Sequence, residues 1–84
     1  MAAYAVYVHL DLLAVLPARG EQRRLIMGFV RLLGDHPFTP GDFTDQDDSL
    51  RTRQIKIIGR YAVTYWADHP VKTVMIVGVR SADR

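Results

Sequence analysis

The sequence contains no cysteine at any of its 84 positions. This absence excludes a disulfide framework and a thiolate metal site. A chain of this length corresponds to a single domain, which we expect to span residues 1–84 and to bury about 60–65% of the surface of its unfolded form. The lack of cysteine fits a reducing compartment, so we expect a cytoplasmic protein.

Long apolar runs are absent as well. The first 20 residues are mostly apolar, but Asp11 interrupts them and no basic leader precedes them. No run approaches the roughly 18 residues of a membrane-spanning helix. We therefore interpret the N-terminal segment as folded structure rather than as a signal peptide, and we expect no membrane partner.

Motifs for metals, cofactors and nucleophilic catalysis are also missing. No two histidines stand at metal-ligand spacing on one expected element. His36 and His69 each precede a proline at the end of an expected element, which favours a turn, and His9 ends the first expected strand. The chain has no nucleophile elbow, phosphate-binding loop or dinucleotide-binding glycine pattern. We expect neither a metal nor a cofactor.

Basic residues are lacking between residues 35 and 48, where the sequence has five aspartates. Residues 49–84 instead hold seven lysines and arginines against two aspartates, although the net charge of the chain is only +2. A basic C-terminal half behind an acidic loop is a charge pattern that indicates binding to a polyanion or to an acidic partner. An ordinary solvated surface is the alternative.

The first half of the chain predicts one strand and two helices. Tyrosine and valine favour a strand over Ala3–His9, and a short helix is expected over Leu10–Leu16. A longer helix, roughly residues 18–33, is predicted by apolar residues three and four positions apart, and Gly34 ends it. This apolar stripe consists of Leu25, Ile26, Phe29, Leu32 and Leu33.

The second half predicts a loop over residues 38–49 and then three strands. The strands Arg51–Ile58, Tyr61–Trp66 and Val71–Arg80 are joined by short turns, which indicates an antiparallel meander. The expected fold is α+β: an antiparallel sheet of about four strands, in the order β-α-α-β-β-β, with the main amphipathic helix packed on one face.

Alternation along the three strands assigns their faces. The core under the helix is expected to hold Ile55, Ile57, Tyr61, Val63, Tyr65, Met75, Val77 and Val79. The uncovered face is expected to show Gln54, Lys56, Thr64, Trp66 and Arg80, with Gly78 leaving a gap beside Arg80. This uncovered face is where we expect the chemistry.

Residues 53–84, RQIKIIGRYAVTYWADHPVKTVMIVGVRSADR, resemble the RelE/ParE superfamily of toxins from bacterial toxin–antitoxin pairs. The shared pattern is a basic strand, a Gly-Arg turn, a Tyr-x-Val-x-Tyr strand, an acidic turn and an apolar strand that ends in Gly-x-Arg. The resemblance implies a ribosome-dependent mRNA endonuclease. It implies that Lys56 and Arg80 are catalytic, with Arg80 stabilising the charge of the phosphate.

The sequence also departs from the family pattern. The other strand lysine of the family falls at Gln54, and its third-strand arginine falls at Ala62 or is displaced to Arg60. The tyrosine that follows the last strand has no counterpart, so the chain resembles a short variant without the C-terminal tail. Each missing electrostatic group typically costs 10²–10³ in rate, so we do not expect a complete nuclease site.

Further residues are candidates for binding RNA or a protein partner: Gln54, Arg53, Arg60, Trp66 and Arg84. Trp66 fits a platform for a base, an anchor for a peptide or a cover for the sheet edge. The toxin reading implies a cognate antitoxin peptide and either ribosome-bound mRNA or DNA gyrase as the target. The alternatives are a non-catalytic protein-binding module, either gyrase-binding or homodimerising, and a nucleic-acid-binding protein without enzyme activity.

Overall fold

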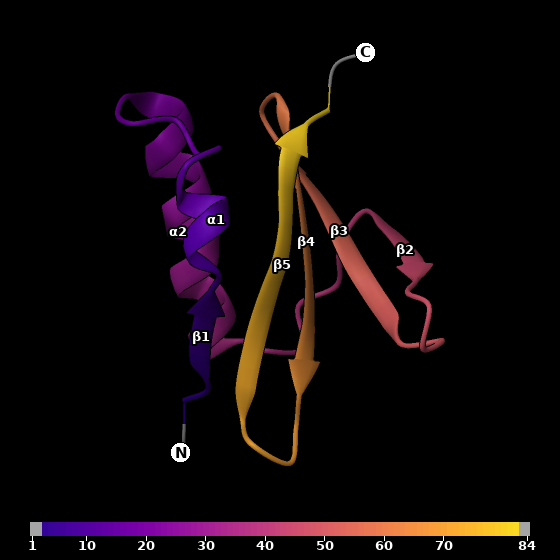
Figure 1. Cartoon of the computed structure of the whole chain (residues 1–84). Helices are drawn as coiled ribbons and strands as arrows, with labels where there is room; N and C mark the ends of the chain where they lie inside the picture. Colours follow the sequence, from indigo (N-terminus) through magenta and orange to yellow (C-terminus); the bar gives the residue numbers. More distant parts are fainter. Residues whose placement is uncertain (1–2, 83–84) are drawn as a thin grey trace.

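The computed structural model describes residues 3–82, which form a five-stranded sheet with two helices beside it (Figure 1). The strands lie in the order β1-β5-β4-β3-β2. The elements are β1 (Ala5–Val8), α1 (Leu10–Leu13), α2 (Glu21–Asp35), β2 (Phe43–Gln46), β3 (Thr52–Ile58), β4 (Tyr61–Asp68) and β5 (Thr73–Ser81).

The α+β fold, the main helix on one face and the closing antiparallel meander are confirmed. The sheet differs from the expectation in two respects. A fifth strand, β2, forms inside the expected loop and pairs antiparallel with β3, and β1 runs parallel to β5, so the sheet is mixed. The parallel pair arises because the two helices carry the chain across the sheet before the meander begins, as parallel neighbours require.

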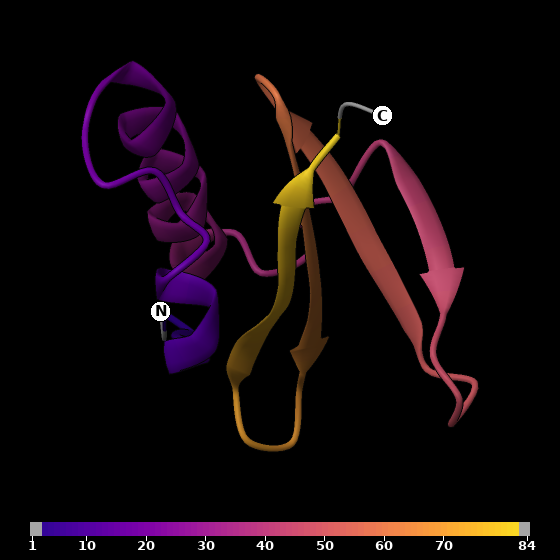
Figure 2. The same ribbon diagram turned by 45° about the horizontal axis from the view of Figure 1, so that its top comes forward.

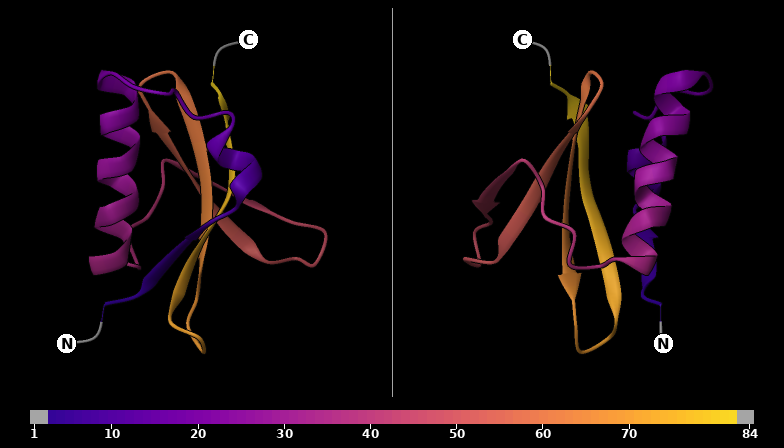
Figure 3. Two further views of the ribbon diagram at one scale, coloured as in Figure 1. Left: turned by 60° about the vertical axis from the view of Figure 1, so that its left-hand side comes forward. Right: turned by 180° about the vertical axis from the view of Figure 1, so that it is seen from behind.

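The longer helix, α2, covers one face of the sheet (Figure 3). Its buried side chains Ile26, Val30 and Leu33 pack into one core with residues of β4 and β5. Phe29 adds an edge-to-face contact with Tyr65, whose ring centroid lies 5.4 Å away. The predicted amphipathic stripe thus buries its inner half, while Leu25 and Leu32 remain exposed.

An extra residue in β5 changes which of its side chains enter the core. Thr64 of β4 pairs with Gly78, but the next residue, Tyr65, pairs with Ile76, so Val77 has no partner of its own. Such a bulge shifts the alternation by one position. Consequently Ile76 is 1% exposed whereas Val77 is 41% exposed. The expected burial of Val79 is confirmed, and the expected core positions of Met75 and Val77 are wrong.

The faces of β3 are also reversed relative to the expectation. Lys56 pairs with Val63, and Gln54 pairs with Tyr65, so both lie on the side that α2 covers. The expected core residues Ile55 and Ile57 lie on the opposite side. Pairing decides the faces here, because a shift of one residue turns every side chain of a strand to the other side.

The turn between β3 and β4 is fixed by a side chain of α2. The Gln22 amide nitrogen donates to the carbonyl oxygen of Ile58 at 2.8 Å, and its oxygen accepts from the backbone N–H of Arg60 at 3.2 Å. Gly59 between them has a φ of 60°, which glycine adopts without strain. This clamp holds Ile58 opposite Tyr61 and thereby sets the register of β3 against β4.

At the other end, β3 and β2 separate from β4, as Figures 1 and 2 show. The pairing of β3 with β4 extends only to Gln54 and Tyr65, whereas β4 remains paired with β5 as far as Asp68. The segment between α2 and β2 crosses this region, and Thr39 within it accepts a hydrogen bond from the Tyr65 hydroxyl at 2.9 Å.

The bulge in β5 leads to opposite expectations for two neighbouring residues. Ile76→Ala should destabilise the protein by about 2–5 kcal/mol, because it leaves a cavity in the core. Val77→Ala should change the free energy of unfolding by less than about 0.5 kcal/mol, because the side chain is largely exposed. Urea denaturation of both variants measures the difference, and a larger loss for Val77→Ala would contradict this register.

Candidate functional site

The side of the sheet opposite α2 is called the open face here. The register places on it alternate residues of β3 and β4 and the β5 residues that pair with those of β4. These residues include Arg53, Ile55, Ile57, Ala62, Thr64, Trp66, Met75, Gly78 and Arg80. Of the predicted site residues, the structure therefore brings Arg53, Trp66 and Arg80 to one face.

Arg80 lies between two shallow clefts of the open face. The first has a volume of about 420 Å³ and a mainly apolar lining that includes Phe43, Ile55 and Ile57. The second, of about 350 Å³, is more polar and is lined in part by Arg53 and Thr64. Within residues 3–82, Arg80 makes no ion pair, so its guanidinium is available to a ligand.

Arg53, by contrast, is already engaged by the neighbouring strand. Its Nε and Nη2 atoms donate to the two carboxylate oxygens of Asp45 on β2, at 2.9 and 2.7 Å. These hydrogen bonds lower the pKa of Asp45, and the positive charge of Arg80 adds to the effect. An anionic ligand must therefore compete with Asp45 for Arg53, whereas it meets no such competitor at Arg80.

The expectation that Lys56 and Arg80 share one face is wrong, because Lys56 lies on the opposite side of the sheet from Arg80. Its Nζ atom lies 3.4 Å from a carboxylate oxygen of Asp42. The other oxygen of Asp42 accepts the backbone N–H of Ile57 at 2.8 Å, and this hydrogen bond is the main reason that the pKa of Asp42 is lowered. Lys56 is thus part of the contact between β3 and the segment that connects α2 to β2.

The other predicted binding residues also lie apart from Arg80. Gln54 is on the side that α2 covers, where its side-chain oxygen accepts the N–H of Gly41 at 2.9 Å. Arg60 lies in the turn clamped by Gln22, at the end of the sheet. Arg84 lies outside the described residues.

Trp66 marks the end of the open face where β3 leaves β4. The guanidinium carbon of Arg51, the residue before β3, lies 4.0 Å from the centroid of the indole ring. Arg51 also forms an ion pair with Asp47 at 3.2 Å. Sequence reasoning did not single out Arg51, because its contact with Trp66 depends on how β3 diverges from β4 and has no local signal.

The charged groups around the two clefts are Arg53, Arg80 and Asp45. Among the described residues, no group of three or more histidines, aspartates or glutamates is placed to hold a metal ion. The carboxylate nearest to the polar cleft, Asp45, is held ionised by Arg53, so it is a poor proton donor at neutral pH.

None of the described helices is long and apolar enough to cross a membrane.

Comparison with known proteins gives a match at the level of structure only. No protein-family model matches the sequence, and no curated protein matches it either. The fold is similar to that of a chain in the crystal structure of the archaeal RelE–RelB complex from Pyrococcus horikoshii OT3. The TM-score is 0.78 over 98% of both chains, at 17% sequence identity. The protein therefore has a RelE-like fold.

The carboxylates around β2 and β3 predict a loss of stability in acid. Because the folded state lowers the pKa of Asp42 below its ordinary value of 3.8, the stabilisation is complete above that value and is lost as the pH falls through the lowered pKa. The urea concentration at the midpoint of unfolding should therefore decrease as the pH is lowered from 7 to about 3.

Asp42→Asn should lower this midpoint at pH 7 and make it less dependent on pH, because the variant has no proton to take up at this position. Asp48→Asn is the matched control, since the Asp48 carboxylate accepts no hydrogen bond within the described part of the chain. An equal effect of both substitutions on the pH dependence would contradict the role given to Asp42.

Proposed function

We propose that this protein is the toxin-like component of a toxin–antitoxin pair and that it acts on mRNA through its open face. The observation that carries the proposal is the unpaired Arg80, which stands at the end of the last strand between two clefts. A guanidinium with free donors suits a phosphate, which it can bind through two parallel hydrogen bonds. The RelE-like fold supports the toxin-like role.

The proposed action is binding of RNA with little or no cleavage. Cleavage through the 2′-hydroxyl requires a group that takes up a proton and positive charge around the phosphate. Lys56 is directed to the other side of the sheet, and Arg53 is occupied by Asp45. Arg80 alone can hold a phosphate, but it is a poor base because it stays protonated.

We further propose that an antitoxin peptide silences the protein. The structural neighbour is a complex of RelE with RelB, which supports a partner of this kind. The basic character of this chain, with a net charge of +2, favours a partner with acidic side chains. We place both proteins in the cytoplasm, where mRNA is translated.

The apolar cleft beside Arg80 favours a second candidate, a non-catalytic protein-binding module. Phe43 is 59% exposed and Ile57 is 36% exposed, so this part of the open face presents apolar surface to a protein such as gyrase or a second copy of the chain. Contact of this kind is only weakly sensitive to salt. RNA binding through phosphates should instead weaken steeply between low and physiological salt.

Inducible expression tests the proposed function. Expression of the wild type should arrest growth, and Arg80→Ala should relieve the arrest, because the contact of one charged group with a phosphate contributes about 1.5–3 kcal/mol. The affinity of the purified variant for single-stranded RNA should fall about tenfold or more.

Two variants serve as controls. Lys56→Ala should still arrest growth, because Lys56 lies away from the open face. Arg31→Ala, which removes an exposed arginine from α2, should also still arrest growth. Relief by Lys56→Ala but not by Arg80→Ala would refute the proposal, as would binding to RNA that does not depend on salt.

A further inference from the structure

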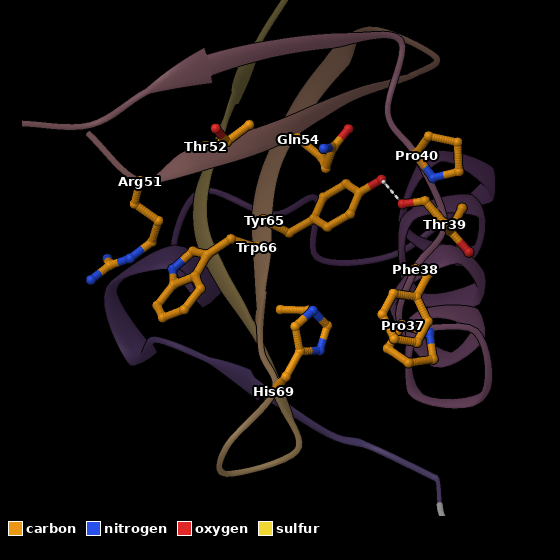
Figure 4. A pocket seen from close by; sticks show the side chains of 11 residues that line it. Pro37, Phe38, Thr39, Pro40, Arg51, Thr52, Gln54, Tyr65, Trp66 and His69 are labelled. Carbon is orange, nitrogen blue, oxygen red and sulfur yellow. Dashed lines mark hydrogen bonds between the residues drawn. The ribbon is translucent and has the colours of Figure 1, made fainter. Parts of the chain in front are cut away.

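A cleft lies where β3 and β4 separate, at the end of the molecule away from the turn that Gln22 clamps (Figure 4). It opens because the pairing of β3 with β4 stops at Gln54 and Tyr65. Its volume of about 410 Å³ falls within the roughly 300–1,000 Å³ of small-molecule sites. Trp66 also belongs to the open face, whereas Gln54 and Tyr65 reach the cleft from the side that α2 covers.

Aromatic rings form two walls of this cleft. On one side is Trp66, and the guanidinium of Arg51 covers one face of its indole ring. On the other side the rings of Phe38 and His69 are stacked, with centroids 4.8 Å apart and planes inclined by 22°. Figure 4 shows Arg51 on the outer side of the indole and the residues Phe38 and His69 across the cleft from it. The inner side of the indole is therefore available to a flat ligand.

Polar groups lie between these walls. The Gln54 side chain uses its oxygen to accept the N–H of Gly41, which leaves its amide N–H groups without a partner in the described part of the chain. Thr52 adds a hydroxyl group to the lining. In addition, β4 pairs only with β5 beyond Tyr65 within the described residues, so one edge of its backbone borders the cleft.

We propose that this cleft holds one unstacked nucleobase of a single-stranded RNA, a subsite that deepens the proposed function and rests on it. A base has a flat π-surface for the indole and a polar edge for groups such as the Gln54 amide. Proteins that bind single strands combine such stacking platforms with cations that follow the backbone. Here Arg80 on the open face is the cation without an ion pair among the described residues, whereas Arg53 would first have to leave Asp45.

These observations favour a base over an apolar peptide side chain. An apolar side chain would fill the space between the rings but would leave the Gln54 amide and the Thr52 hydroxyl without partners. Arg51 also favours a base, because its guanidinium lies over one face of the indole and leaves the other face to the ligand. A phosphate next to the bound base would compete with Asp47 for Arg51.

The chain contains a single tryptophan, so fluorescence excited at wavelengths that the four tyrosines do not absorb comes from Trp66 alone. A titration of the wild-type protein with a short single-stranded oligoadenylate should quench the fluorescence of Trp66 and reach saturation. Adenosine monophosphate should quench it at higher concentration. Ribose 5-phosphate, which has the phosphate but no base, should not quench it.

Variants of the platform test the inference by RNA binding, measured through the anisotropy of a labelled oligoadenylate. Trp66→Leu should weaken binding by about tenfold or more, and Trp66→Phe should restore most of the loss, because a stacked base contributes mainly through ring contact. Tyr7→Leu is the matched control, since it removes an exposed aromatic ring of β1 outside the cleft. Circular dichroism verifies that each variant is folded.

Three results would overturn the inference. The first is RNA binding that Trp66→Leu leaves unchanged, and the second is quenching by ribose 5-phosphate equal to that by the nucleotide. The third is quenching by an apolar peptide but not by RNA, which would identify a protein partner. If Arg80→Ala relieves growth arrest and weakens RNA binding while Trp66→Leu does neither, the subsite is wrong and the proposed function stands. If the wild type neither arrests growth nor binds RNA, both are wrong.

Discussion

The register of β4 against its two neighbours determines what this protein presents to a ligand. On the β3 side, the clamp of Gln22 holds Ile58 opposite Tyr61. On the β5 side, the bulge at Val77 shifts the pairing of Thr73–Ile76 by one position. Each device turns a whole set of side chains to one face or the other. The core, the open face and the cleft at Trp66 all depend on these two local features.

The second strand, β2, controls the charges of the open face. It pairs with β3 and places Asp45 beside Arg53, while the residues that flank β2 place Asp42 beside Lys56 and Asp47 beside Arg51. Three of the cations that the composition offers to a polyanion are therefore neutralised by neighbours. Within residues 3–82 Arg80 makes no ion pair, although its charge acts on Asp45, which forms its hydrogen bonds with Arg53 instead.

The open face and the cleft meet at Trp66, where β3 leaves β4. Arg80 lies toward the end that Gln22 clamps, the Arg53–Asp45 pair lies in the middle, and Trp66 with Arg51 lies at the splayed end. Because of the ion pair in the middle, an anionic ligand must displace Asp45 before it can bind Arg53.

The sequence by itself determined the helices, the strands other than β2, and their order. The apolar stripe predicted α2, the short turns predicted the meander, and the pattern of residues 53–84 indicated the RelE-like fold that the structure has. It also identified Arg80 and Trp66 as residues of the uncovered face. These inferences succeeded because helix periodicity, turn residues and the alternation within β4 are local properties of the chain.

Only the tertiary structure decided the faces of β3, the core of β5 and the strand β2. Alternation alone could not place Lys56 or Ile57, because the two-fold repeat of a strand says nothing about which side meets the helix. The bulge at Val77 leaves no mark in a run of apolar residues, and β2 forms in a polar segment because β3 offers it an edge. Such features arise from contacts between distant segments of the chain. Whether Lys56 and Arg80 share a face of the sheet could therefore be decided only by the fold.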